Sequence, residues 1–349
     1  MGKRKRYLIL NSPQSLAPAH SQREREFFSS LPARIFLLLL AAHCFLLNVG
    51  GQTPDPAETI RIDTDLVNLN INVLSRDFSQ PAAVLQQKDF AILEDGTPQD
   101  ISFFASAETP FDLVLLLDLS GSTADKIGLT RKSSKRFVDA GRPDDRIAIV
   151  TFADTIQVVS LLTADHEALK KSIGDIDKPV GGTRFWDALR FVVEHVLGRS
   201  RAENRRTAIV VMTDGVDNAI PDVVGEGSRT SFDELLEIVR SSDTIVMPIY
   251  LDTEQEGAGQ HHMLSSAYAL ARQELDQLAA ESGNVVYRAR KVKDLEGVYA
   301  KVMHDLSTVY SIGYRPTTRP RDGSWRKITV QLFGHPDLVV RSKRGYYAR

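Results

Sequence analysis

The alternation of apolar and polar residues divides the chain into β-rich ends and a central α/β stretch. After Leu66, the apolar residues Val67, Leu69, Ile71 and Val73 alternate with asparagines. A period of two is typical of a strand with one buried face. The same alternation returns after residue 309, so both ends of the chain are predicted to be antiparallel β-structure.

A turn signal lies inside the first of these β-rich ends. Phe90 and Ile92 lead into Glu94-Asp95-Gly96, a sequence that favours a tight hairpin turn. Ile101 and Phe103 have the spacing of a strand. We therefore expect them to form the returning strand of the hairpin.

The central stretch has a different pattern, in which continuous apolar runs alternate with helical periodicity. The runs are Leu113–Leu117, Ile147–Val150, Ala208–Met212 and Ile245–Ile249. Runs of this kind are typical of strands buried on both faces of a parallel sheet. The predicted helices span about 124–140, 166–174, 185–198, 232–242, 266–282 and 292–308. Strand and helix alternation predicts a doubly wound, Rossmann-like α/β domain.

Each β-rich end has too few strands to bury an apolar face by itself. We expect the two ends to pair into one small β-sandwich-like domain, with the α/β domain inserted between them. The predicted division is 1–52 for a signal peptide or anchor, 60–108 and 309–349 for the β-rich domain, and 110–306 for the α/β domain.

An apolar run of export-signal length lies near the start of the chain. Ile35–Val49 follows Arg34 and is shorter than the roughly 20 residues of a membrane-spanning helix. This pattern predicts export to the periplasm, the cell surface or the medium. Cleavage near Gly51–Gln52 and retention as an uncleaved anchor are both open. The single cysteine, Cys44, lies in this run, so the remainder of the chain cannot form a disulfide.

The charge distribution bears on possible partners. The formal net charge is −2, although residues 1–52 hold seven Lys or Arg against two Glu, so the rest of the chain is acidic. An acidic body argues against nucleic acid, because a basic surface is needed to displace counterions. A membrane contact is expected only through a retained N-terminal segment.

Three short motifs place oxygen-bearing side chains near the carboxyl ends of predicted strands. They are Asp118-Leu119-Ser120-Gly121-Ser122, Gly181-Gly182-Thr183 and Thr213-Asp214-Gly215. Ligand sites of open α/β sheets gather at this edge, so the motifs are expected to converge. Each motif alone is ordinary turn or cap chemistry. The candidate ligands among them are two carboxylates and three hydroxyls, Asp118, Ser120, Ser122, Thr183 and Asp214, which suit Mg²⁺, or Mn²⁺ or Ca²⁺, rather than zinc.

In these motifs the sequence resembles the von Willebrand factor A family. The metal-ion-dependent adhesion site of that family uses Asp-x-Ser-x-Ser, a later Thr and a still later Asp. Asp118, Ser120, Ser122, Thr183 and Asp214 match in that order. The resemblance implies adhesion or complex assembly, in which the metal bridges to an Asp or Glu of a protein partner.

A weaker resemblance to exported bacterial members of the family lies in the β-rich ends. It rests on the motifs Phe90-Ala91-Ile92-Leu93-Glu94-Asp95-Gly96, Ile312-Gly313-Tyr314 and Arg344-Gly345-Tyr346.

Near the metal motifs, Asp217 and Asn218 are expected to cap or order the loop after Asp214. Asp187 is expected to lie in the first turn of a helix and to suit the helix dipole.

Other classes of function fit the sequence less well than a binding module. A metal-dependent phosphohydrolase could use Asp118 as its nucleophile, but Ser120 stands where haloacid-dehalogenase-like enzymes carry a second Asp as acid/base. The sequence has neither a phosphate-binding Gly-x-x-x-x-Gly-Lys-Ser/Thr loop nor a Gly-x-Ser-x-Gly elbow. A chelatase-type subunit would work in the cytoplasm, which the export signal opposes. A structural envelope scaffold remains an alternative. We expect a non-enzymatic binding module.

Overall fold

The structure is a computed structural model of the whole chain. It describes residues 66–75, 84–121, 127–177, 181–198, 200, 205–251, 265–289, 294–317 and 321–348. The predictions made for residues 1–52 lie outside the described residues. Ser122 lies outside them as well.

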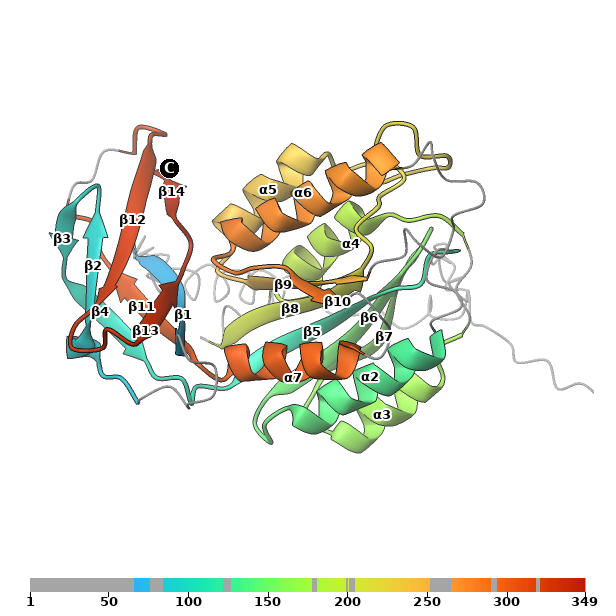
Figure 1. Cartoon of the computed structure of the whole chain (residues 1–349), viewed down its shortest axis with the longest axis horizontal. Coiled ribbons are helices and arrows are strands. Elements are labelled where there is room, and N and C mark those ends of the chain that lie inside the picture. The colour runs from blue at the N-terminus through green and yellow to red at the C-terminus, as the bar shows by residue number, and fades with distance from the viewer. Residues whose placement is uncertain are drawn as a thin grey trace, which may run out of the picture. The chain divides into compact units, whose positions relative to one another are not determined.

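A six-stranded sheet forms the centre of the α/β part, in the order β10-β9-β8-β5-β6-β7 (Figure 1). Its strands are β5 (Phe111–Asp118), β6 (Arg146–Phe152), β7 (Ile156–Thr163), β8 (Arg206–Thr213), β9 (Ile245–Leu251) and β10 (Tyr287–Ala289). Neighbouring strands are parallel, except that β7 is antiparallel to β6. The sequence predicted a parallel sheet, and the observed sheet is mixed. The reason is that three residues between β6 and β7 are too few for a parallel crossover.

Helices cover both faces of this sheet, as Figure 1 shows. One face carries α2 (Ile127–Ala140), α3 (His166–Gly174) and α7 (Leu295–Leu306). The other carries α4 (Phe185–Phe191), which continues into the π-helical turn η4 (Val192–Val196), together with α5 (Phe232–Ser241) and α6 (Ser265–Glu281). This arrangement confirms the doubly wound α/β prediction.

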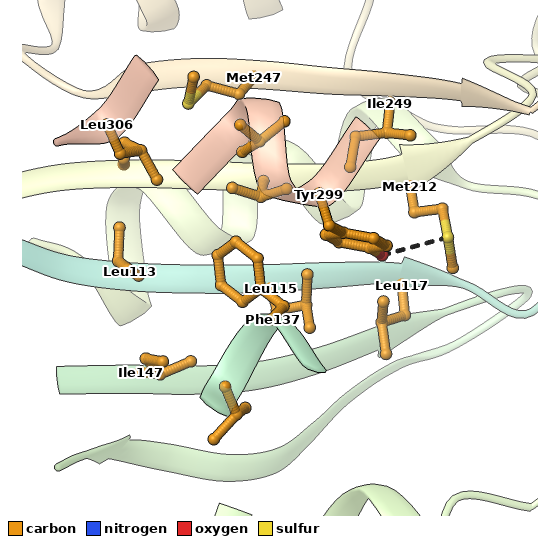
Figure 2. Packing of buried hydrophobic residues seen from close by; sticks show 14 of the residues in the cluster. Leu113, Leu115, Leu117, Phe137, Ile147, Met212, Met247, Ile249, Tyr299 and Leu306 are labelled. Atoms are coloured by element: carbon orange, nitrogen blue, oxygen red, sulfur yellow. Dashed lines mark hydrogen bonds between the residues drawn. The ribbon is translucent and has the colours of Figure 1, made fainter. Parts of the chain in front are cut away.

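The continuous apolar run of β5 is explained by its position between two cores. Leu113, Leu115 and Leu117 point into the core under α2, α3 and α7, while Val114 and Leu116 belong to the opposite core. Figure 2 shows the first core. There the rings of Phe137 and Tyr299 meet edge to face, with their centroids 5.8 Å apart. The Tyr299 hydroxyl donates a hydrogen bond to the Met212 sulfur, with the oxygen and sulfur 3.3 Å apart.

The two ends of the chain form two antiparallel sheets that share one core. One sheet has the order β13-β1-β11-β4 and the other β14-β12-β2-β3. The strands are β1 (Val67–Ser75), β2 (Phe90–Glu94), β3 (Thr97–Gln99), β4 (Ile101–Ala105), β11 (Val309–Tyr314), β12 (Trp325–Leu332), β13 (Leu338–Arg341) and β14 (Gly345–Tyr347), with the short 3-10 turn η2 (Gln87–Asp89) before β2. Because β1 pairs with β11 and β2 pairs with β12, the prediction that both ends build one β-unit is confirmed.

The predicted hairpin exists, but its returning strand is not the expected one. Asp95 and Gly96 form the turn with φ values of 49° and 84°, and a two-residue turn with both φ angles positive matches the twist of its strands. The strand that returns is β3, and β4, which holds Ile101 and Phe103, pairs with β11 in the other sheet. The chain changes sheets at Asp100, between β3 and β4.

The three motifs of the weaker resemblance meet at one buried carboxylate. Glu94 is 4% exposed, and its Oε2 accepts hydrogen bonds from the hydroxyls of Tyr314 (2.7 Å) and Tyr346 (3.0 Å). Burial and the bond to Glu94 raise the pKa of Tyr314, so this tyrosine stays protonated as a donor. A polar network in the core is thus one reason that distant motifs of both chain ends belong together.

The polar side of β1 does not face water, contrary to the simplest interpretation of its alternation. The side-chain amides of Asn68 and Asn70 donate to the side chain and the backbone carbonyl of Asp243, over 3.1 and 2.5 Å. The amide of Asn72 donates to the carbonyl of Asp305, over 2.5 Å. The asparagines therefore satisfy polar groups of the α/β part, which the alternation alone does not distinguish from solvation.

Two arginines hold the segments that connect the β-unit to the α/β part. Arg206 is buried, and its guanidinium donates to the carbonyls of Ala107, Thr109 and Val309. Arg142 donates to the same Ala107 carbonyl over 2.8 Å. Burial and the nearby charge of Arg142 lower the pKa of Arg206 to about 9, which leaves it charged at neutral pH. Arg206 thus binds both the segment before β5 and the segment after α7.

Candidate metal centre

The first motif begins where β5 ends. Asp118 is 1% exposed and Ser120 is 2% exposed. The backbone N–H of Ser120 donates to Oδ1 of Asp118 over 2.8 Å, and the N–H of Leu119 donates to the carbonyl of Phe152 over 2.8 Å. The turn after β5 is therefore held both by its own aspartate and by the neighbouring strand β6.

The second motif is held against the first by a backbone hydrogen bond. The N–H of Gly121 donates to the carbonyl of Gly181 over 3.2 Å. Gly181 has a φ of 106°, and a Cβ there would lie 1.8 Å from Oδ2 of Asp154. The N–H of Gly182 donates to Oδ1 of the same Asp154 over 2.6 Å. Only glycine fits between these groups, and the turn positions Thr183, which is 6% exposed.

The third motif follows β8 and is tied to both of the others. The Thr213 hydroxyl donates to Oδ2 of Asp118 over 2.6 Å and accepts from the Gly215 N–H over 2.9 Å. Asn218 accepts from the Thr183 N–H at its Oδ1 over 2.9 Å, and its own N–H donates to the Thr183 carbonyl over 3.0 Å. The predicted convergence of the motifs is therefore seen for Asp118, Ser120, Thr183 and Asp214.

The electrostatics of this cluster are those of two buried like charges. Asp118 and Asp214 are each 1% exposed. Burial and, after it, the neighbouring carboxylate of Asp214 raise the pKa of Asp118 above its usual range, against hydrogen bonds from Ser120 and Thr213 that lower it. A divalent cation would offset this repulsion, since an opposite charge favours both ionised carboxylates.

The donor set fits a hard cation. Its described members are two carboxylates and two hydroxyls, all oxygen, as Mg²⁺ and Ca²⁺ prefer. Across the described ranges, no three or more His, Cys, Asp or Glu residues gather as a metal cage. A metal here would therefore depend on hydroxyls and water besides the two aspartates.

The sequence analysis did not identify Asp154, nor the hydrogen bonds by which Thr213 joins Asp118 to Gly215. Asp154 follows the carboxyl end of β6, at the same edge as Asp118, and that position was the available signal. The expectation for Asp217 and Asn218 is confirmed, since both order the loop after Asp214. Asp187 does lie in the first turn of α4, and it also accepts from the N–H groups of Arg229 and Thr230 over 3.0 and 2.9 Å.

A cavity of about 500 Å³ opens beside the Asp118–Ser120 turn. It lies between Leu119, strands β6 and β7 and the end of α3, and Asp175 and Asp177 are among its lining residues. The cavity therefore adjoins the first motif through Leu119.

Comparison with known proteins gives one family, a sequence relative and several solved structures of low identity. The profile of the von Willebrand factor type A domain matches residues 112–301. A UPF0353 protein of Nocardia farcinica is 24% identical over 226 residues, which cover 61% of this chain and 65% of that protein.

Solved structures with a similar arrangement include three proteins. The mussel byssus proximal thread matrix protein 1, in a form whose metal-ion-dependent adhesion site holds zinc, has 19% identity and a TM-score of 0.40, covering 57% of this chain and 48% of its own. The pilus adhesin SpaC of Lactobacillus rhamnosus GG has 11% identity and a TM-score of 0.43, covering 80% and 48%. The PilB minor pilin of Streptococcus sanguinis has 14% identity and a TM-score of 0.43, covering 57% and 62%. The chain thus spans between 48% and 65% of the length of these relatives.

Proposed function

We propose, from the premise that this chain belongs to the von Willebrand factor type A domain family, that it is a metal-dependent protein-binding module. One observation carries the proposal: three motifs far apart in the sequence bring Asp118 and Asp214, two buried carboxylates, together with the hydroxyl-bearing residues Ser120 and Thr183. Divalent cations such as Mg²⁺ and Ca²⁺ are bound by oxygen ligands, and a preformed set of oxygens suits one such ion.

In this proposal the residues have separate tasks. Ser120, Ser122 and Thr183 supply hydroxyl ligands, and Asp118 and Asp214 balance the charge of the ion, partly through water. The ion is Mg²⁺, or Mn²⁺ or Ca²⁺. When bound, it supplies a positive centre with one position open for a carboxylate of another molecule. An Asp or Glu of the partner protein fills that position.

The structure favours this function over a phosphohydrolase. A nucleophilic aspartate needs a free carboxylate oxygen directed at the substrate. Asp118 is 1% exposed, and its two oxygens accept hydrogen bonds from Ser120 and Thr213. These hydrogen bonds support a role for Asp118 in organising the site rather than in attacking a phosphate.

The test is recovery of a partner from the native envelope fraction with Mg²⁺ and with EDTA. The wild type should retain a partner only with Mg²⁺, and Asp118→Asn should retain none. Asp144→Asn, a change at an exposed aspartate, is the control and should behave as the wild type. Partner recovery that is equal in Mg²⁺ and EDTA would refute the proposal. Hydrolysis of p-nitrophenyl phosphate that Asp118→Asn abolishes would support the enzyme instead.

We further propose that the protein acts outside the cytoplasm. The support is Arg34 followed by the apolar Ile35–Val49 run. Within the described part of the chain, no helix is long and apolar enough to cross a membrane. Cell fractionation should find the protein in the periplasm, on the surface or in the medium, with a new N-terminus near Gln52 if the segment is cleaved. Full-length protein in the cytosol would contradict this.

A further inference from the structure

One buried carboxylate holds both ends of the segment that follows β8. Asp217 is fully buried. Its Oδ1 accepts from the backbone N–H groups of Ala219 (2.8 Å) and Ser228 (3.0 Å), and its Oδ2 accepts from the Trp186 N–H (3.0 Å) and the Ser228 hydroxyl (2.6 Å). The segment is thereby closed into a loop, which we call the rim loop (residues 219–228).

A single side chain joins the tip of the rim loop to the candidate metal centre. Asn218 accepts from the Thr183 N–H and donates from Nδ2 to the carbonyl of Val224, each over 2.9 Å. Gly182 and Gly225 leave room for this amide, since a Cβ at either would lie 2.7 or 2.2 Å from Asn218 Nδ2. Val224 is therefore held one side chain away from a proposed metal ligand.

The backbone at the tip adopts conformations that most residues avoid. Asp222 has a φ of 68° and Gly225 a φ of 120°. Between them the side chain of Val224 is 93% exposed. Asp is one of the few non-glycine residues that adopt a left-handed conformation readily, so Asp222 suits a tight turn here. The side-chain amide of Asn218 holds the Val224 carbonyl, and the Val224 side chain is presented to the outside.

Two of the charged residues beside the tip are paired with each other. Arg184, next to Thr183, forms an ion pair with Glu226 of the rim loop, with Nη2 and Oε1 2.6 Å apart. The pair leaves Val224 in a surface without a net charge from these two groups. An apolar neighbour at Val224 therefore leaves Arg184 and Glu226 paired with each other.

We infer that the rim loop is a second, preformed contact for the partner, and that the partner carries an aliphatic or aromatic side chain close in sequence to its metal-binding Asp or Glu. The inference rests on the proposed function, because it gives the partner's carboxylate its place beside Thr183. The apolar side chain packs on Val224 and removes both from water. Because the loop is already ordered, binding does not have to fix its conformation, and more of the gain appears as affinity.

Exposed apolar residues that occur singly are common and need no function. The chain offers a matched control in Val84, which is 87% exposed and lies just before η2 of the β-unit. The inference predicts that Val224 matters for the partner and Val84 does not.

The experiment is selection of phage-displayed random dodecapeptides on the full-length protein in Mg²⁺, with elution by EDTA. Wild type and Val84→Asp should both enrich peptides with an Asp or Glu and an apolar residue at a fixed spacing from it. Val224→Asp and Val224→Ser should still enrich the acidic residue and lose the apolar preference. Wild-type-selected peptides should bind either Val224 variant about tenfold more weakly. Circular dichroism verifies that each variant is folded.

The outcomes separate the two ideas. Acidic peptides whose apolar preference is absent, or survives in both Val224 variants, would overturn the rim-loop inference and leave the metal-dependent function standing. An absence of EDTA-eluted peptides from the folded wild type would overturn the function and the inference together. Enrichment of basic residues at a fixed spacing, in place of apolar ones, would assign the second contact to the cavity lined by Asp175 and Asp177 and would also refute the rim loop.

Discussion

At the scale of single residues, the candidate metal centre contains two carboxylates whose like charges oppose folding. Asp118 and Asp214 are buried close enough for one carboxylate to raise the pKa of the other. Two like charges without a counterion destabilise the folded state, whereas a ligand that binds only the folded state stabilises it. The same two residues should therefore have opposite effects with and without a metal.

We therefore predict that Asp118→Asn does not lower the thermal stability of the protein without metal, but lowers it relative to the wild type when Mg²⁺ is bound. In EDTA the variant should melt at the same temperature as the wild type or higher, because one buried charge is gone. Saturating Mg²⁺, at about a hundredfold over its Kd, should stabilise the wild type by about 3 kcal/mol and leave the variant unchanged. Ser120→Ala removes one neutral ligand and should keep part of the Mg²⁺ effect. Scanning calorimetry in both buffers measures this, and equal Mg²⁺ stabilisation of wild type and Asp118→Asn would contradict it.

A second buried acid lies behind the rim loop, on α6. Glu274 is 8% exposed, and Oε2 has no hydrogen-bond partner within the described part of the chain. Burial, and after it the charge of Asp217, raises the pKa of Glu274 from 4.5 to about 7. The folded protein therefore holds a proton between these values that the unfolded chain has lost. The contribution of Glu274 to stability is then most unfavourable above pH 7 and vanishes below pH 4.5.

Glu274→Gln should therefore stabilise the protein at pH 8, by up to about 3 kcal/mol, and have no effect at pH 4. Urea unfolding at a series of pH values measures the difference in the free energy of unfolding. The exposed change Glu108→Gln is the control and should give no pH-dependent difference. A Glu274→Gln effect that does not grow with pH between these limits would show that the carboxylate is solvated.

At the scale of elements, the rim loop is held at the carboxyl edge of the sheet by the buried side chain of Asp217. Asp217 accepts four hydrogen bonds from α4 and from both ends of the rim loop. Each bond to a buried charged acceptor is worth more than an average hydrogen bond. The rim loop is thus a part of the folded core in energetic terms, although its tip is exposed.

Asp217→Asn tests this view of the rim loop. An amide offers one acceptor oxygen and two donors where the surroundings supply four donors, so at least one pair of donors would face each other. We expect a loss of about 2–4 kcal/mol in the free energy of unfolding. Asp233→Asn, at an exposed position in the first turn of α5, should change it by less than about 0.5 kcal/mol. Chemical denaturation provides the measurement, and similar stabilities of the two variants would refute the role of Asp217.

At the scale of the whole molecule, neither end of the chain has a complete sheet. β1 pairs with β11 and β13, and β2 pairs with β12 as well as β3. The apolar residues of these strands share one core, which includes Leu69, Ile71, Phe90 and Tyr310. The folded β-unit therefore requires segments more than two hundred residues apart in the sequence.

Deletion of residues 309–349 should expose the edges of β1 and β2 together with this core, and open apolar edges pair with other chains. The truncated protein should aggregate, as measured by size-exclusion chromatography and thioflavin fluorescence. Deletion of 345–349 alone removes the edge strand β14 and is the milder control, which should stay monodisperse. A monodisperse protein after the longer deletion would show that the leading strands do not depend on the tail.

The sequence by itself determined the features that depend on local periodicity and on chemistry at strand ends. The continuous runs around Leu113–Leu117 and Ala208–Met212 are typical of strands covered on both faces, and their carboxyl ends predicted where Asp118 and Asp214 would lie. Glu94-Asp95-Gly96 predicted its hairpin, because positive φ values restrict the residues that can form such a turn.

Only the tertiary structure decided the features that depend on partners distant in the sequence. β7 is an edge strand with a mixed exposure pattern, so periodicity did not reveal it. Asn68 and Asn72 bind Asp243 and Asp305 rather than water. The alternation of apolar and polar residues along β1 is the same in both cases. Asp154 supports Gly181 and Gly182 through contacts that no local spacing encodes. The physical reason is that hydrophobic periodicity indicates which side of an element is buried. The group that a polar side chain contacts depends on how the elements pack together.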